Sequence, residues 1–463
     1  MKKIITTLLC LALGTTTLWA QNHVLTLDSC ISMALRHQAT LKNARLDVKQ
    51  ARQTRKEAFT RYFPTLSASA SYFTSLNPLI DLHSSEAEGS VTVHTELDDN
   101  ADFPFDVDQA LHDLVNSLDI DVGIQMLDHG TMMGLSAMQP IFVGGRIING
   151  NKLAQLGIDA AELQLAMSIN EVVLSTTQRY QMVLSLMEKQ KVVEQALQLI
   201  DTLQRDAQSA FDAGIVGRND LLKVRLKRTE LLSQQQQLNN GLHLATLALR
   251  QFVGLSMTDT STWVLTPVKL NEKETLPLLL SDAEECVCKR AESQLLDLQV
   301  EAKQIERKMQ LGEMLPQLMM GGTYGYSNIL GNKYSQNGIV FASLNVPLTA
   351  WWSGSHTLKK KNIELQQAEN LRNELHEQMI LQTLQAHSTM VEASLQLKMK
   401  QEAVSQAQEN LEENRHYYQA GLSSISDYLE AQTLFQQCLD DQAEQEQNLI
   451  LAILRYNQHC SNN

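Results

Sequence analysis

Basic residues are missing from one long stretch of this 463-residue chain. No Lys or Arg occurs between Arg61 and Arg146, and 13 acidic residues fall inside that gap, from Asp81 to Asp128. The formal net charge of -14 is therefore concentrated there, and the rest of the chain is close to neutral. Nucleic-acid binding needs a basic face, and because none is visible we expect no nucleic-acid partner.

The chain has only six cysteines, and their spacing predicts neither a disulfide framework nor a metal site. A phosphate-binding loop, a nucleophile elbow and a dinucleotide fingerprint are also missing. We therefore expect no cofactor, no bound metal and no enzymatic activity. Five cysteines follow the N-terminal segment and are interpreted as buried or free thiols: Cys30, Cys286, Cys288, Cys438 and Cys460.

Long apolar runs are missing too, so the sequence predicts no helical membrane anchor. The apolar segment near the start, residues 4–13, follows two lysines and precedes small residues. That order is typical of a secretory signal peptide with a cleavage point after Ala20. We expect residues 1–20 to be removed on export.

Proline is absent between Pro140 and Pro267 and again after Pro347. Both blocks are rich in Leu, Gln, Glu, Ala and Lys, which favour helix, and their apolar residues recur at the heptad spacing of coiled coils. Predicted helices cover about residues 26–61, 147–210, 218–253, 281–313, 354–417 and 425–458.

The chain also contains an internal duplication. Gly214 aligns with Gly421, and the sequence around both glycines matches without a gap. Glycine readily takes the left-handed conformation that ends a helix, so we expect a helical hairpin tip at each. We assign residues 21–270 to a first repeat and residues 271–463 to a second, each in the order helix, strand, strand, long helix, helix.

Four prolines border segments in which apolar residues alternate with small or polar ones. These segments follow Pro64, precede Pro140, follow Pro316 and precede Pro347. Each is about as long as a membrane-spanning β-strand, which needs roughly 9–11 residues. The first pair is separated by an acidic insert, about residues 76–122, which we interpret as a large surface loop at the strand tips.

Four such strands would leave unpaired backbone groups at their edges in lipid, so they must close with strands from other copies. The sequence therefore predicts an obligate oligomer. Trp351 and Trp352, at the exit of the fourth strand, suit an aromatic belt at the membrane–water interface. The alternative is that these tryptophans cap a soluble sheet.

The order of elements and the two tips resemble the TolC-like outer membrane efflux protein family. The most specific match is YQAGLSSISDYLEA at residues 418–431, echoed by AGIVGRNDLL at residues 213–222. The resemblance implies a homotrimer whose twelve strands, four per chain, form one outer membrane β-barrel joined to an α-helical tunnel in the periplasm. It also implies a passive exit duct for efflux or secretion, in contact with outer membrane lipid, a periplasmic adaptor (membrane fusion) protein and an inner membrane transporter.

Asp427 and Glu430 are the first candidate gate residues. They are spaced i, i+3 and so share one face of the helix after the second tip. In the family, such carboxylates line the constriction at the periplasmic entrance of the tunnel. Three copies would form two acidic rings, in which like charges raise each other's pKa and favour cations.

Further gate residues follow from the resemblance alone. Family members tie the entrance shut with a bond between a tyrosine and an aspartate on neighbouring hairpins, and the matching residues here are Tyr418 and Asp220. The family's gate arginine is replaced by Ser423, so one charged latch is missing. Arg218 on the other tip is a candidate substitute.

Structural interpretations of the same residues remain open. Ser424 and Asp427 also form the pattern of a helix capping box, and Tyr418 continues the heptad seam. Two other functions remain open as well, a periplasmic coiled-coil adaptor and a structural protein. An adaptor, however, needs compact β domains, and a structural coiled coil does not explain strands at matched places in both repeats.

Overall fold

The computed structural model of the chain describes most of the sequence: residues 23–74, 80–82, 124–126, 129–257, 263–266, 282–328 and 335–460. The predicted signal peptide and nearly all of the predicted acidic insert lie outside the described residues. The chain divides into two compact units. The helical unit draws on Met1–Arg52, Leu156–Glu301 and Gln366–Asn463, and the strand unit on Gln53–Gln155 and Ala302–Leu365. Each unit takes residues from both predicted repeats, whose boundaries stay a prediction.

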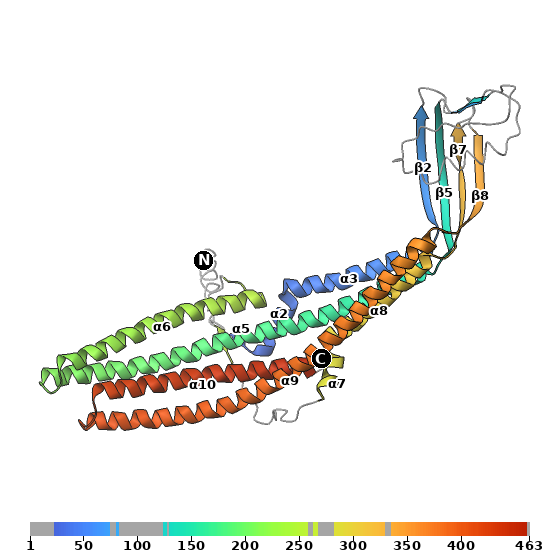
Figure 1. The fold of residues 1–463 in the computed structure, drawn as a ribbon. Helices are drawn as coiled ribbons and strands as arrows, with labels where there is room; N and C mark the ends of the chain where they lie inside the picture. Colours follow the sequence, from blue (N-terminus) through green and yellow to red (C-terminus); the bar gives the residue numbers. More distant parts are fainter. Residues whose placement is uncertain are drawn as a thin grey trace, which may run out of the picture. The chain divides into compact units, whose positions relative to one another are not determined.

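The strand unit contains a four-stranded antiparallel sheet in the order β2-β5-β7-β8 (Figure 1). Its strands are β2 (Thr65–Thr74), β5 (His129–Val143), β7 (Gln317–Asn328) and β8 (Ser335–Asn345). The central β5–β7 pair joins the two predicted repeats, and the outer strands β2 and β8 each have one neighbour in this sheet. A short pair, β3 (Ile80–Leu82) and β4 (Ile124–Met126), lies apart from it in the hydrogen-bonding pattern. The four predicted strands are confirmed.

Large apolar side chains of this sheet are exposed in the single chain. Leu66 on β2 is 80 % exposed and Val340 on β8 is 84 % exposed. Apolar side chains on sheet faces are normally covered, so these positions indicate a surface that another apolar medium or chain covers.

Strand β5 is longer than predicted. The sequence placed its end before Pro140, but pairing with β7 continues to Val143, with an irregular register between Pro140 and Phe142. Proline cannot donate a backbone hydrogen bond, and an irregularity of this kind lets a sheet accommodate it.

Two of the predicted helices are each divided in two. The helix predicted at 26–61 consists of α2 (Leu27–His37) and α3 (Ala39–Thr60), because Gln38 leaves helical geometry with ψ 128°. Its side chain donates to the Phe252 carbonyl at 2.5 Å, a tertiary contact that local propensity does not show. The helix predicted at 281–313 consists of α7 (Ala283–Lys289) and α8 (Ala291–Glu313), which are separated by extended Arg290.

The four long helices are confirmed. They are α5 (Arg146–Asp212), α6 (Arg218–Val253), α9 (Ala350–Gln419) and α10 (Ile425–Cys460). In the helical unit, α5 with α6 and α9 with α10 form two helical hairpins (Figure 1). Arg228 of α6 pairs with Asp201 of α5 at 2.6 Å, and Lys400 of α9 pairs with Asp441 of α10 at 2.7 Å.

An apolar cluster near the tips holds the two hairpins together. It is contributed by α5, α6 and α10: Val193, Ala196, Leu197, Ile200, Leu203, Ala207, Leu221, Val224, Leu231, Ile425 and Tyr428. Gln432 of α10 is also buried, and its side chain donates to the Ala196 carbonyl of α5 at 3.3 Å. The cluster gives both tips a fixed support.

Two glycines form the passage from β5 into α5 in the strand unit. Gly144 and Gly145 have φ of +65° and +74°, a region that L side chains rarely adopt. A Cβ atom on Gly144 would lie 2.0 Å from the Gly312 carbonyl oxygen, and one on Gly312 would lie 2.2 Å from the Gly144 oxygen. The two backbones therefore touch at the junction of strands and helices.

A buried tyrosine secures a small parallel ribbon of the helical unit, in which β1 (His23–Leu25) pairs with β6 (Trp263–Leu265). The Tyr180 hydroxyl lies 2.9 Å from the Leu25 carbonyl and 2.7 Å from the Thr266 carbonyl, its acceptors, and it accepts the Thr266 N–H at 3.1 Å. Burial raises the pKa of Tyr180 to about 12, so the hydroxyl keeps its proton at neutral pH.

Tyr180→Phe is expected to loosen this ribbon by about 1–3 kcal/mol, because it leaves buried backbone groups without a partner. Native-state hydrogen exchange of the β1 and β6 amides would measure the change. Tyr417→Phe, at an exposed tyrosine of α9, is the matched control and should leave these amides unchanged. Equal exchange in both variants would show that the hydroxyl contributes nothing.

No helix among the described residues is long and apolar enough to cross a membrane.

Candidate gate at the helical hairpin tips

The two tips have the same turn. Gly214 and Gly421 both have φ +74°. The Ile215 N–H donates to the Ala210 carbonyl at 2.8 Å, and the Leu422 N–H donates to the Tyr417 carbonyl at 2.8 Å. This pattern closes the end of a helix around a left-handed glycine, so both predicted tips are confirmed.

Asp427 caps the N-terminus of α10. Its Oδ2 accepts the Ser424 hydroxyl at 2.8 Å and the Ser424 N–H at 3.0 Å, and Ser424 Oγ accepts the Asp427 N–H at 3.3 Å. These bonds form the capping box that the sequence offered as an alternative. The Ser424 hydroxyl is the main cause of a lowered pKa of Asp427. The capping bonds therefore stabilise the fold above the ordinary pKa of aspartate and are lost as pH falls through the lowered value.

The structural interpretation of Tyr418 also holds within one chain. Its ring stacks on Tyr428 of α10, with centroids 5.8 Å apart and planes 12° from parallel. Tyr418 packs against the apolar cluster at the tips, and burial raises its pKa, with the charges of Asp206 and Asp220 adding to the effect. Its hydroxyl thus lies in the electrostatic field of Asp220, the partner that the resemblance assigns to it.

Lys223 links the two tips, and sequence reasoning missed it. Its Nζ lies 3.5 Å from the Asp220 carboxylate on its own helix and donates to the Ser426 hydroxyl of α10 at 2.7 Å. Its charge also helps to lower the pKa of Asp427. The i, i+3 spacing of Asp220 and Lys223 was visible in the sequence, but the contact with α10 depends on how the hairpins pack.

Lys223→Met is expected to speed amide exchange in the first turn of α10 roughly fivefold, since an exposed ion pair and one hydrogen bond together are worth about 1 kcal/mol. Hydrogen–deuterium exchange on residues 424–430 would measure it. Lys227→Met is the control, because Lys227 pairs at 3.2 Å with Glu230 on its own helix. If both variants exchange alike, Lys223 does not tie the tips.

The remaining predicted gate residues are exposed near the tips. Glu430 is exposed one turn after Asp427 on α10, and Arg218 is exposed at the first position of α6. Asp427 and Glu430 are both exposed at i, i+3 spacing, so both point away from the apolar cluster. Their arrangement leaves them accessible to a neighbouring copy.

The predicted belt residues belong to the strand unit. Trp351 donates its indole N–H to the Met314 carbonyl at 2.9 Å, which ties the start of α9 to the end of α8. Trp352 is 76 % exposed and lies next to it on the first turn of α9. Trp351 thus has a structural role as well, whereas Trp352 has its ring free for another surface.

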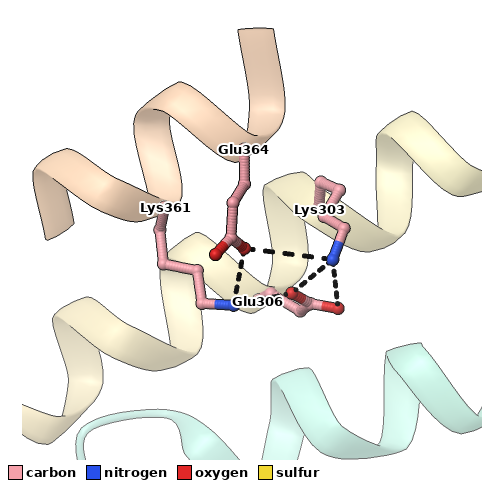
Figure 2. A network of polar contacts seen from close by, with 4 residues as sticks. All are labelled: Lys303, Glu306, Lys361 and Glu364. Atoms are coloured by element: carbon pink, nitrogen blue, oxygen red, sulfur yellow. Dashed lines mark hydrogen bonds and ion pairs between the residues drawn. The ribbon is translucent and has the colours of Figure 1, made fainter. Parts of the chain in front are cut away.

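A closed network of four charges joins α8 and α9 in the strand unit (Figure 2). Lys361 lies 2.9 Å from Glu364 and 3.0 Å from Glu306, and Lys303 lies 3.0 Å from Glu306. Burial favours the neutral form of Glu306, but hydrogen bonds from Lys361 and Lys303 outweigh it and hold the pKa below its ordinary value. The four charges compensate one another, so this network is a clamp between helices.

Among the described residues, no group of three or more His, Cys, Asp or Glu side chains is placed to hold a metal ion. An open surface groove runs along α9 and is lined by residues such as His387, Val391 and Met399.

The fold of this chain is similar to that of solved outer membrane channels. The likeness covers 94 % of this chain in three solved structures: the outer-membrane channel OprN (TM-score 0.75, 14 % identity, 90 % of that chain), VceC from Vibrio cholerae (0.72, 16 %, 96 %) and the CmeC outer membrane channel from Campylobacter jejuni (0.74, 15 %, 85 %). No curated protein matches the chain.

Residues 294–455 match the family model described as outer membrane efflux protein. This part of the chain is thus similar to outer membrane efflux proteins, the family that the sequence resembles.

Proposed function

We propose that three copies of this chain form one passive exit duct of a tripartite efflux or secretion system. In this assembly the strand units contribute twelve strands to one outer membrane barrel, and the helical hairpins form a tunnel in the periplasm. TolC-like channels form trimers, which supports the number of copies.

The sheet edges carry this proposal. In the sheet β2-β5-β7-β8, both β2 and β8 are edge strands. Unpaired edges are costly in lipid, and closed membrane barrels need at least eight strands, so one sheet of four cannot suffice. Exposed Leu66 and Val340 would face lipid, and Trp351 and Trp352 would lie at the membrane–water interface.

The tips would form the gate of the closed duct. Three copies of Asp427 and Glu430 would create two acidic rings, which attract cations and repel one another. Tyr418 and Asp220 would bond across neighbouring hairpins, and Arg218 would replace the charged latch that Ser423 cannot provide.

The tips also suit a docking surface. Ile215 and Leu422 occupy the same place in the two turns, and each is 77 % exposed. Such paired apolar side chains fit the periplasmic adaptor protein that connects a duct of this family to an inner membrane transporter. The substrate would be selected by that transporter.

Native mass spectrometry of the detergent-solubilised protein, taken from the outer membrane fraction, tests the assembly. We expect a mass of three chains. A folded monomer or dimer, or a protein absent from that fraction, would contradict the proposal.

A further inference from the structure

Two cysteines far apart in the sequence meet in the helical unit. Cys286 lies on α7 and Cys460 is the last residue of α10, and these two helices are in contact. The two thiols are close enough to interact, since Cys460 is among the groups that raise the pKa of the Cys286 thiol. Cys286 is 5 % exposed, whereas Cys460 is partly accessible.

We propose that Cys286 and Cys460 form an intramolecular disulfide in the exported protein. The inference rests on the proposed function for its compartment, since the helical unit would then lie in the periplasm, where disulfides form and persist. A disulfide places the two sulfurs about 2.05 Å apart, so the proposed bond requires these two interacting side chains to turn toward one another.

The reaction is a thiol–disulfide exchange with a protein or small-molecule disulfide as the oxidant. The thiolate of Cys460 attacks one sulfur of that oxidant, so a mixed disulfide forms and the first thiol leaves. Cys286 then loses its proton and attacks the Cys460 sulfur, which releases the second thiol. The two cysteines lose two protons and two electrons, and the oxidant is reduced to two thiols.

The burial of Cys286 and the accessibility of Cys460 determine which thiol reacts first. Burial raises the pKa of the Cys286 thiol to about 12, and the contact with Cys460 adds to the effect. A buried thiol that rarely ionises reacts slowly with reagents in solution, so the accessible Cys460 reacts first. Cys286 then needs no access to solvent, because its target is already beside it.

The bond would fasten a short helix to a long one. α7 has seven residues, and a helix of that length has little stability of its own. A covalent link to the end of α10 would hold α7 in place during local opening of this region. The disulfide would thus join α7, near the start of the predicted second repeat, covalently to the end of α10.

Mass spectrometry of the full chain tests the proposal directly. The protein is expressed with its own N-terminus in a Gram-negative host, free thiols are blocked with iodoacetamide before lysis, and the outer membrane fraction is digested without reductant. We expect a linked peptide pair that joins Cys286 to Cys460. It should persist in Cys288→Ser, the matched control on α7, and vanish in Cys286→Ser and Cys460→Ser.

Reduction should also release α7, with amide exchange there rising roughly tenfold in the wild type and not in Cys286→Ser. Alkylated Cys286 and Cys460 in protein assembled in the outer membrane would overturn the disulfide and leave the proposed function intact. A chain absent from the outer membrane would overturn the proposed function instead. The purified folded chain is then treated with oxidised glutathione, and failure to form the Cys286–Cys460 bond would overturn the disulfide.

Discussion

Gly144→Ala is expected to destabilise the strand unit by at least about 3 kcal/mol and to remove assembled protein from the outer membrane. The new Cβ atom would lie 2.0 Å from the Gly312 carbonyl oxygen, and φ at this position is +65°. The Gly312 carbonyl belongs to the backbone and cannot move away from the new Cβ atom as the end of a flexible side chain could. The yield of trimer in the outer membrane and the unfolding midpoint in denaturant are the measurements.

Gly145→Ala is the matched control for this prediction. Gly145 shares the left-handed conformation with φ +74°, but the nearest atom to its Cβ would be Asn149 Nδ2 at 3.8 Å. Only the conformational cost of about 1–2 kcal/mol applies there. Gly312→Ala should be as damaging as Gly144→Ala, because the contact is mutual. If Gly144→Ala assembles as well as Gly145→Ala, the backbone contact is not what holds the junction.

Asp427→Ala combined with Glu430→Ala is expected to raise single-channel conductance and to raise the divalent cation concentration for half block roughly tenfold. Each chain would otherwise contribute two exposed carboxylates to the acidic rings at the tips. Without these carboxylates the rings no longer attract divalent cations. The opening also loses the charges that hinder the passage of other ions, so conductance rises. Planar-bilayer recording of the purified protein measures both quantities.

Two control variants distinguish the effect of losing the carboxylate charges from the effect of weakening the tip. Ser424→Ala removes the capping partner of Asp427 and keeps its charge, so it should weaken the tip by about 1 kcal/mol and leave divalent block unchanged. Replacing Glu409 and Glu412 by alanine removes the same charge from exposed positions on α9. Block that changes equally in this control, or stays unchanged in the Asp427 and Glu430 variant, would refute the gate assignment.

Much of the fold could be predicted because it is local and repeated. Proline-free heptad blocks predict the long helices, and the aligned glycines predict both tips with their shared turn. The breaks at Gln38 and Arg290 could not be predicted in the same way. Gln38 leaves the helix where its side chain meets the Phe252 carbonyl, a contact more than 200 residues away in sequence.

Less of the candidate site could be predicted from the sequence. Spacing places Asp427 and Glu430 on one face, but a capping box and a gate use the same aspartate, and one chain shows only the first. The Lys223 link depends on Ser426, which lies in the other predicted repeat, 203 residues away in sequence. The network of Lys303 and Glu364 was likewise hidden, because its charges come from helices on both sides of the second strand pair.

Planar-bilayer conductance of the purified native protein, with divalent cations added, tests the central claim most directly. Three copies that close one duct with acidic rings predict small, cation-selective openings that divalent cations block. A folded trimer from the outer membrane that conducts anions preferentially, or whose openings ignore divalent cations, would contradict the acidic gate. Openings in multiples of separate pores would contradict the single shared duct.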